Sequence, residues 1–237
     1  MGYAIMQKEL VVPALEQLKR AFAVLPTLTE LDAQTVANDA FGIVMRGLEL
    51  DQATLLQEAL LVERVETLIV DEFNLPALPT AKIVRRVEFL TDHLKVYDSM
   101  KREAEVPWRD IMFIAAGLVR VRETHRVREL ETVGGTRTKE ELTGHLLLDL
   151  FLNGGTTRYS ITAEDFSFEH LGARLSDDLA TNFVLLIQQL AQHASHAGQN
   201  RGAFMACQQP PELFPYPSKQ TFNEELTWML WRIAQIR

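Results

Sequence analysis

The sequence predicts an α+β fold in which a small α/β domain, residues 1–75, precedes a larger strand-rich domain, residues 81–198. The Pro-rich segment 75–80 separates the two, because prolines interrupt helices and central strands. Ahead of this segment the apolar residues recur mostly with helical spacing, whereas after it they alternate as in strands. The strand-rich part ends in one strongly amphipathic helix. A Pro-interrupted tail, residues 199–237, carries a terminal helix of its own.

Composition and charge narrow the classes of protein. The 237 residues are 47% hydrophobic and 24% charged, the balance of a globular protein with enough apolar surface to fold. A formal net charge of −8 argues against broad nucleic-acid binding, which needs a basic surface. Cys207 is the only cysteine, which excludes an intrachain disulfide and fits a reducing compartment. The N-terminus lacks a signal-peptide pattern and no apolar stretch reaches the ~20 residues of a transmembrane segment, so we expect a cytoplasmic location.

The elements of the first part follow from helix-start signals and short apolar runs. Pro13 fits the first turn of a helix over residues 14–22, although residues 21–25 are read alternatively as a strand that Pro26 ends. We expect about two helices and two or three strands in all. The further elements are a helix that begins at the capping pair Thr29 and Asp32, a strand over 42–47, a helix capped by Asp51 and a strand over 65–70.

In the second part we expect antiparallel strands that form a small barrel or bent sheet, closed at one end by a helix. That helix has Ser176 as its N-cap, an apolar stripe from Leu179 to Leu190, and Gly198 as its C-terminal stop. The turn over 153–155, Asn-Gly-Gly, predicts a hairpin. The strands are expected over 82–89, 94–97, 110–114, 118–130, 145–152 and 158–161, and the tail helix over 221–236.

Residues 81–197 resemble a pleckstrin-homology-type domain. The resemblance rests on the strand order, on the run from Val106 to Ile111 (Val-Pro-Trp-Arg-Asp-Ile) that enters a strand, and on the helix at its end. It implies an antiparallel barrel capped by a helix, with binding of a ligand or partner, commonly an anionic lipid headgroup or a peptide. The chain departs from lipid-binding members at the first hairpin turn, where His93 and Lys95 are the only cations. The whole arrangement resembles a bacterial protein outside the named enzyme families.

Four arginines at even-numbered positions are the sharpest local feature. On an unbroken strand such positions share one face, so the row predicts a set of guanidinium groups for phosphate or carboxylate. The alternative is a solvated sheet face, offset by Glu123, Glu129 and Glu131, and a bulge would separate the row into two faces. The candidate ligand-binding residues are Arg120, Arg122, Arg126 and Arg128.

The other residues with chemically reactive or metal-binding side chains, and the glycine pair, are interpreted as structural. The glycine pair Gly134 and Gly135 lacks the spacing of a phosphate-binding loop and is interpreted as a surface loop. His193 and His196 are spaced for one helix face but lack a third ligand nearby, so no metal is expected. Cys207 has no identifiable base beside it and is interpreted as an inert thiol. We therefore expect no catalytic residue and no cofactor.

The sequence favours a non-catalytic interaction or regulatory module that binds a protein or an anionic ligand through the arginine row. One alternative is an enzyme that uses Glu164, Asp165, Glu169 and His170, which place carboxylates near an imidazole. Another is a structural subunit that pairs with a second copy through the tail helix, which carries Trp228 and Trp231. This helix has too few cations for a membrane-surface element, so packing on its own core or in a homodimer is expected.

Overall fold

The computed structural model describes residues 2–39, 41–128 and 136–236, and the side chains of residues 39, 122–128, 136–141 and 236 fall outside this description. The chain forms two compact units. Unit 1 comprises Met1–Leu78 and Gln220–Arg237, and unit 2 comprises Pro79–Lys219. The expected tail is thus divided, since its terminal helix belongs to unit 1 and the segment before it to unit 2. Both units combine helices with sheets, and the predicted α+β class is confirmed.

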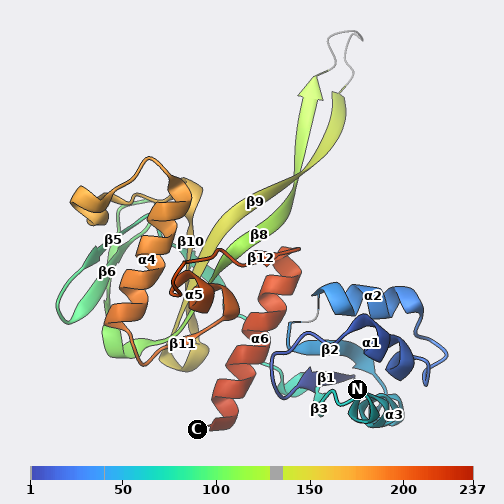
Figure 1. Ribbon diagram of the computed structural model, residues 1–237. Coiled ribbons are helices and arrows are strands. Elements are labelled where there is room, and N and C mark those ends of the chain that lie inside the picture. The colour runs from blue at the N-terminus through green and yellow to red at the C-terminus, as the bar shows by residue number, and fades with distance from the viewer. Residues whose placement is uncertain (1, 40, 129–135, 237) are drawn as a thin grey trace. The chain divides into compact units, whose positions relative to one another are not determined.

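Unit 1 is built on a three-stranded antiparallel sheet in the order β2-β1-β3 (Figure 1). The predicted helix after Pro13 is confirmed, and Thr29 and Asp32 exchange the expected hydrogen bonds ahead of the second helix. Helix α3 begins after Glu49 rather than at Asp51. The elements are β1 (Tyr3–Gln7), α1 (Leu15–Phe22), α2 (Glu30–Asp39), β2 (Ile43–Leu48), α3 (Leu50–Val62), β3 (Thr67–Asp71) and α6 (Lys219–Ile236).

The central strand β1 has apolar contacts on both faces, because successive side chains of a strand point in opposite directions. Ile5 packs with residues of α1 and α3, such as Leu18 and Leu56. Ala4 and Met6 belong to a second cluster with Trp228, which α6 supplies. Unit 1 therefore consists of three layers, in which the sheet lies between the helices that precede β3 and the last helix of the chain.

Trp228 attaches α6 to the sheet of unit 1. The indole is buried, and its Nε1–H donates to the backbone oxygen of Gln7 at 2.7 Å. Gly42 has a φ of +87°, and a Cβ at this position would lie 2.3 Å from Cγ of Trp228. Only glycine allows this approach, since it lacks a Cβ and tolerates positive φ.

Unit 2 contains two open sheets. One has the order β11-β8-β9-β10-β4, with β12 also paired to β8, and the other has the order β5-β6-β7. The predicted hairpin at Asn153–Gly155 is confirmed, with Thr157 opposite Leu152. The elements are β4 (Ala81–Ile83), β5 (Arg86–Phe89), β6 (His93–Tyr97), β7 (Glu103–Pro107), β8 (Ile111–Arg128), β9 (Thr136–Leu152), β10 (Thr157–Thr162), α4 (Leu179–His193), β11 (Gly198–Gln199), α5 (Arg201–Ala206) and β12 (Pro215–Tyr216), with 3-10 turns at Trp108–Asp110, Ala163–Asp165 and Glu169–Arg174.

The prediction of an antiparallel barrel is wrong, because both sheets are open and do not close. The chain changes sheet at two corners, at Val84 and Arg85 between β4 and β5, and at the 3-10 turn Trp108–Asp110 between β7 and β8. In addition, β4, β11 and β12 join their neighbours in parallel rather than antiparallel pairing. The two sheets nevertheless share one apolar core with α4, to which Val96, Leu148 and Phe183 contribute.

Helix α4 has the predicted apolar stripe but different ends. Its N-cap is Asp178, whose carboxylate accepts from the backbone N–H of Thr181 at 2.9 Å, while Ser176 lies two residues earlier and its hydroxyl accepts from the N–H of Asp178. The helix ends at His193, and Gly198 begins β11 instead of stopping the helix. The stripe depends only on spacing, whereas either hydroxyl or carboxylate is able to serve as the cap.

Asn200 attaches the segment after α4 to β8. Its side-chain amide donates to the backbone oxygen of Ala116 at 3.0 Å and accepts from the backbone N–H of the same residue at 2.9 Å. The amide also donates to the Tyr216 hydroxyl and caps α5 through the N–H of Ala203. A buried polar group with all its partners present stabilises one arrangement of the neighbouring segments.

The contact between Gly42 and Trp228 predicts a large difference between two glycine variants. Gly42→Ala combines positive φ with a collision against the indole and should lower the free energy of unfolding by about 2–4 kcal/mol. Gly47→Ala is the matched control, because Gly47 also has positive φ (+72°) but has no atom within 4 Å of a built Cβ. It should cost only about 1 kcal/mol. Equal losses in urea unfolding would contradict the assigned contact.

Candidate functional site

The four predicted arginines lie on β8. Arg120 is exposed, while the side chains of Arg122, Arg126 and Arg128 fall outside the described residues, as do Gly134 and Gly135. The backbone pairing of β8 with β9 is shifted only between Ile111 and Phe113, so no bulge interrupts the strand near the arginines. Their positions therefore fall on alternate residues of one continuous ladder.

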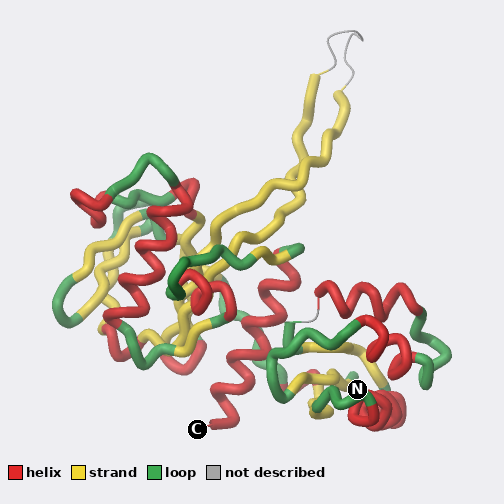
Figure 2. Tube along the Cα trace, viewed as in Figure 1, coloured by secondary structure: helices red, strands yellow, loops and turns green. Residues whose placement is uncertain are grey.

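The arginine positions lie where β8 and β9 extend beyond the rest of their sheet (Figures 1 and 2). The last pair of β8 with β12 is at Val119, and the last pair of β9 with β10 is at Leu147. Beyond these points, within the described residues, the two strands pair only with each other, from Arg120 opposite Gly144 to Arg128 opposite Thr136. We call this two-stranded extension, residues 120–128 and 136–146, the arm.

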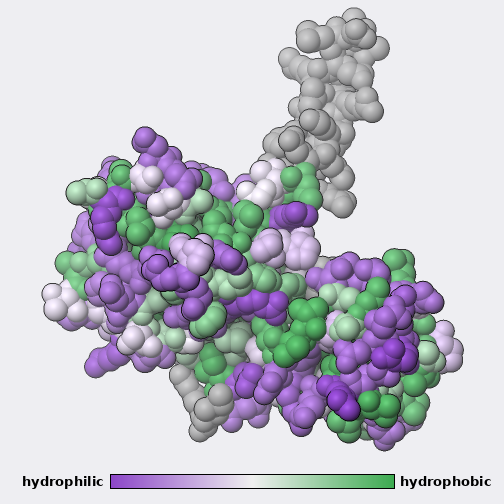
Figure 3. All heavy atoms as spheres, viewed as in Figure 1, coloured by the Kyte–Doolittle hydropathy of each residue, from purple (hydrophilic) through white to green (hydrophobic). Residues whose placement is uncertain are grey.

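A cavity of about 670 Å³ on unit 2 brings together three cations that the sequence interpretation did not single out. Hydrophilic and apolar side chains are interspersed over the visible face of this unit (Figure 3), so the cavity is assigned from its lining residues. Arg85 and Arg86 come from the corner between β4 and β5, and Lys101 comes from the turn between β6 and β7. The lining also includes Tyr97, Ser99 and Ser167 as hydroxyl donors, and Asp98, Asp165 and Glu169 as acids.

Backbone hydrogen bonds on both sides hold the two arginines in the cavity wall. The N–H of Arg85 donates to the oxygen of Tyr97 at 2.7 Å, and the oxygen of Arg85 accepts from the N–H of Ser167 at 2.8 Å. Arg86 pairs with Tyr97 on β6 and forms an isolated bridge with Ser167. Its guanidinium carbon lies 4.0 Å from the centre of the Tyr97 ring, a cation–π geometry.

The turn that carries Lys101 is closed by Asp98. The N–H of Lys101 donates to the oxygen of Asp98 at 3.0 Å, and the Asp98 carboxylate accepts from the N–H groups of Met100 and Arg102. Lys101 has a φ of 60°, the position of a hairpin turn that normally takes glycine. A lysine here carries a conformational cost that glycine would avoid.

Most acids around the cavity already have cationic partners. Asp165 is 2.8 Å from Nη1 of Arg85, and Asp98 is 2.6 Å from Nε of Arg102. Partial burial alone would raise the pKa of Asp98, but its hydrogen bonds from Arg102 and Met100 outweigh this, and its pKa lies below the ordinary value. No ion pair of Lys101 or Glu169 is found within the described residues. The cavity therefore offers an ammonium group and hydroxyl donors beside carboxylates that are largely neutralised.

The four residues of the alternative enzyme hypothesis do not converge on one site. Glu164 accepts from the backbone N–H of Leu146 and lies 3.7 Å from Nδ1 of His145. Asp165 pairs with Arg85, and both Asp165 and Glu169 line the cavity. His170 instead lies among aromatic rings, with its centroid 5.2 Å from that of Phe89 and 6.0 Å from that of Phe166.

Both ring nitrogens of His170 are buried without a hydrogen-bond partner. Burial, assisted by the nearby charge of Arg174, lowers the pKa of His170 from 6.5 to about 4. The imidazole is therefore neutral at pH 7 and contributes to the fold as an aromatic ring. His193 also joins this cluster, with its ring 4.6 Å from that of Trp108.

The remaining candidate groups show no metal-binding arrangement. Within the described residues, no group of three or more histidine, cysteine, aspartate or glutamate side chains is placed to hold a metal ion. Nδ1 of His193 lies 2.9 Å from the backbone oxygen of Gln189, and partial burial raises the pKa of the Cys207 thiol.

Comparison of the chain with protein-family models, with curated proteins and with solved structures gives no match. The resemblance to pleckstrin-homology domains therefore stays a prediction. The basis for a function is the arrangement of the residues in the site. None of the helices in the described part of the chain combines the length and the apolar character needed to cross a bilayer.

The pKa of His170 predicts a specific pH dependence of stability. Because the folded pKa lies below the unfolded value, the neutral ring contributes fully above pH 6.5, and this contribution is lost as the pH falls towards 4. Between pH 7.5 and 4.5 the parent should lose roughly 1–3 kcal/mol more than His170→Phe, after allowance for residual solvent exposure. Urea unfolding at both pH values measures this. His196→Gln, at an exposed histidine, should behave like the parent; identical pH profiles for parent and His170→Phe would contradict the assignment.

Proposed function

We propose that unit 2 is a non-catalytic module that binds a small phosphate-bearing anion in the cavity of Arg85, Arg86 and Lys101. The observation that carries this proposal is the convergence of three cations from two separate turns beside Asp98 and Asp165, two acids that already have cationic partners. Guanidinium forks and an ammonium group suit the several oxygens of a phosphate. Anion binding is also what the pleckstrin-homology resemblance implies, although through a different turn from the one usual in lipid-binding members.

The wall of the cavity supports a binding role. The arginines are fixed by backbone hydrogen bonds and by the Tyr97 ring, which is the preorganisation that a recognition site needs.

Lys101→Gly tests this site without a cost to folding. Glycine suits the positive φ of this position, so the free energy of unfolding should be unchanged or raised by up to about 1 kcal/mol. Loss of one charge-assisted contact should weaken binding of inorganic pyrophosphate about tenfold. Isothermal titration calorimetry at constant ionic strength measures the affinity.

Arg109→Gln is the matched control, because it removes one positive charge from an exposed residue of unit 2 outside the cavity. It should bind pyrophosphate like the parent. The proposal is rejected if the parent does not bind pyrophosphate, or if Lys101→Gly and Arg109→Gln bind it equally well.

The arm is a second proposed contact surface, for a protein partner. The unbroken ladder favours it, because four arginine positions follow one another along an extension that pairs with nothing else in the described part of the chain. Under the alternative, a solvated strand face, charges of either sign would serve equally well. A homodimer through α6 also stays a prediction, and Trp228 packs on the sheet of its own unit.

Reversal of charge at two arm positions separates these interpretations. Arg122→Glu combined with Arg126→Glu should abolish retention of a protein partner from host lysate, whereas Arg109→Glu should not. Circular dichroism should show both variants folded, because the proposal assigns these positions to contact with a partner and not to the core. Retention of the same partner by the double variant would reject the arm as the contact surface.

A further inference from the structure

Unit 1 contains a separate cavity of about 560 Å³, a volume in the range of small-molecule sites (~300–1,000 Å³). Its wall is assembled from the end of β1, the segment before α1, the turn between α3 and β3, and α6. Three cations, two carboxylates and a short apolar segment lie in this wall, namely Lys8, Arg64 and Arg232, Glu9 and Glu66, and Val11, Val12 and Pro13.

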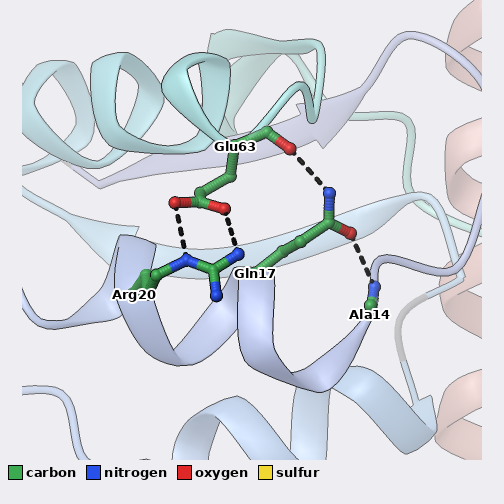
Figure 4. Close-up of polar contacts among 4 residues, drawn as sticks. All are labelled: Ala14, Gln17, Arg20 and Glu63. Carbon is green, nitrogen blue, oxygen red and sulfur yellow. Dashed lines mark hydrogen bonds and ion pairs between the residues drawn. The ribbon is translucent and has the colours of Figure 1, made fainter.

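A polar network fixes the wall at the end of α3 (Figure 4). Arg20 on α1 donates to both carboxylate oxygens of Glu63, at 2.9 and 2.6 Å. Gln17 donates to the backbone oxygen of Glu63 at 2.7 Å and accepts from the N–H of Ala14 at 3.0 Å. The residue that immediately precedes Arg64 is thus held through its side chain and its backbone.

Arg64 occupies a position that normally belongs to glycine. The N–H of Val65 donates to the oxygen of Leu60, and the N–H of Arg64 donates to the oxygen of Leu61, which together form a Schellman motif. Arg64 has a φ of 62°, where an L side chain is strained and glycine is preferred. The geometry of this turn favours glycine and does not account for an arginine at this position. The side chain of Arg64 lines the cavity, and a role there accounts for the arginine.

The other two cations approach the cavity from different elements. The guanidinium carbon of Arg232 lies 4.9 Å from the centre of the Trp228 ring, so the buried indole positions this side chain. Lys8 is paired with Glu66 at 3.1 Å. Within the described residues, neither Arg64 nor Arg232 has a carboxylate within ion-pair distance. Two guanidinium groups therefore line the same cavity without an acidic partner in the part of the chain that the structure describes.

The segment before α1 adds an apolar surface to this positive site. Val11 and Val12 are 63% and 45% exposed, although they are large apolar residues beside the cavity. Gln7 fixes the segment, because its Nε2–H₂ group donates to the oxygen of Val11 and its Oε1 accepts from the N–H of Gly42. The cavity thus combines exposed apolar side chains with two guanidinium groups that have no acidic partner among the described residues.

We propose that this cavity binds a small organic anion that has one carboxylate and an apolar chain. The carboxylate accepts hydrogen bonds from Arg64 and Arg232, whose forked donors match its two oxygens, and the chain covers Val11, Val12 and Pro13. This ligand differs from that of unit 2, because the unit 2 cavity places cations beside hydroxyl donors rather than beside an exposed aliphatic segment.

The test uses the full chain and three probes, octanoate, acetate and 1-octanol, in titrations followed by two-dimensional ¹H–¹⁵N NMR. Octanoate should shift the amide signals of residues 8–13 and 64–66. Acetate, which lacks the chain, and octanol, which lacks the charge, should each bind at least tenfold more weakly. Saturation by octanol at the octanoate concentration would overturn the proposal, since the cations would then have no part in binding.

Arg64→Gly is the decisive variant. Glycine relieves the positive φ, so the midpoint of thermal unfolding should be unchanged or higher, while octanoate affinity should fall at least tenfold. Arg232→Gln should weaken binding similarly, and Arg46→Gln, an arginine of unit 1 outside the cavity, should leave it unchanged. Unchanged affinity in a stably folded Arg64→Gly variant would overturn the proposal. Pyrophosphate binding by unit 2 should be the same in all three variants, so failure at one site is distinguishable from failure at the other.

Discussion

The hydrogen bond from Trp228 to Gln7 joins residues at opposite ends of the chain, and the architecture of unit 1 depends on it. The sheet of this unit presents Ala4, Met6 and Ile43 on the face that α6 covers. Without α6 this apolar face would be exposed to water, at a cost of about 25 cal/mol for each Å². Unit 1 is therefore discontinuous in sequence, and an isolated segment 1–75 lacks one of its three layers. The cavity that includes Arg232 depends on the same contact, because the indole of Trp228 supports that guanidinium group.

Both candidate cavities place a cation in a turn at a position that favours glycine. Lys101 closes a hairpin turn at φ 60°, and Arg64 closes a helix at φ 62°. In each case an acidic residue that precedes the cation in the turn, Asp98 or Glu63, is held by hydrogen bonds, so the turn keeps its shape despite the strain. Strain that the surrounding structure maintains is a feature of functional sites more often than of packing, and here it occurs twice beside a cavity.

The sequence predicted the elements whose signals are local. The stripe of α4, the hairpin at Asn153–Gly155 and the capping pair at Thr29 and Asp32 each depend on residues close in the chain, and each is present. The strand β1 was missed, because both of its faces are buried and its residues show no alternation. The open sheets were also missed, since pairing between strands depends on residues far apart in sequence.

The cavities were not predicted, because they form at turns that the sequence pattern did not reveal. Residues 82–89 read as one strand, in which Arg85 and Arg86 would simply point to opposite faces. The structure breaks this segment into β4 and β5, and the corner between them turns both arginines towards the turn of Lys101. That turn contains no glycine, so the usual signal of a positive φ is absent from the sequence. Asp98 was a usable signal, because an aspartate that begins a polar turn commonly caps the N–H groups that follow it.

The arm needs both a source of stability and protection of its two edges. A two-stranded ribbon alone is marginally stable in water, so its order has to come from the six-stranded sheet in which β8 begins and β9 ends. Both of its edges lie beyond the last pairs with β12 and β10 and leave backbone groups without strand partners in the described part of the chain. Edges of this kind are protected from aggregation when the residues along them are charged. The sequence of the arm, rich in arginine and glutamate, meets that requirement. Protection of the edge and recognition of an acidic partner thus use the same residue types, so composition alone does not separate the two roles. The sign of the charge separates them, because charges of either sign protect the edge, whereas only positive charges recognise an acidic partner.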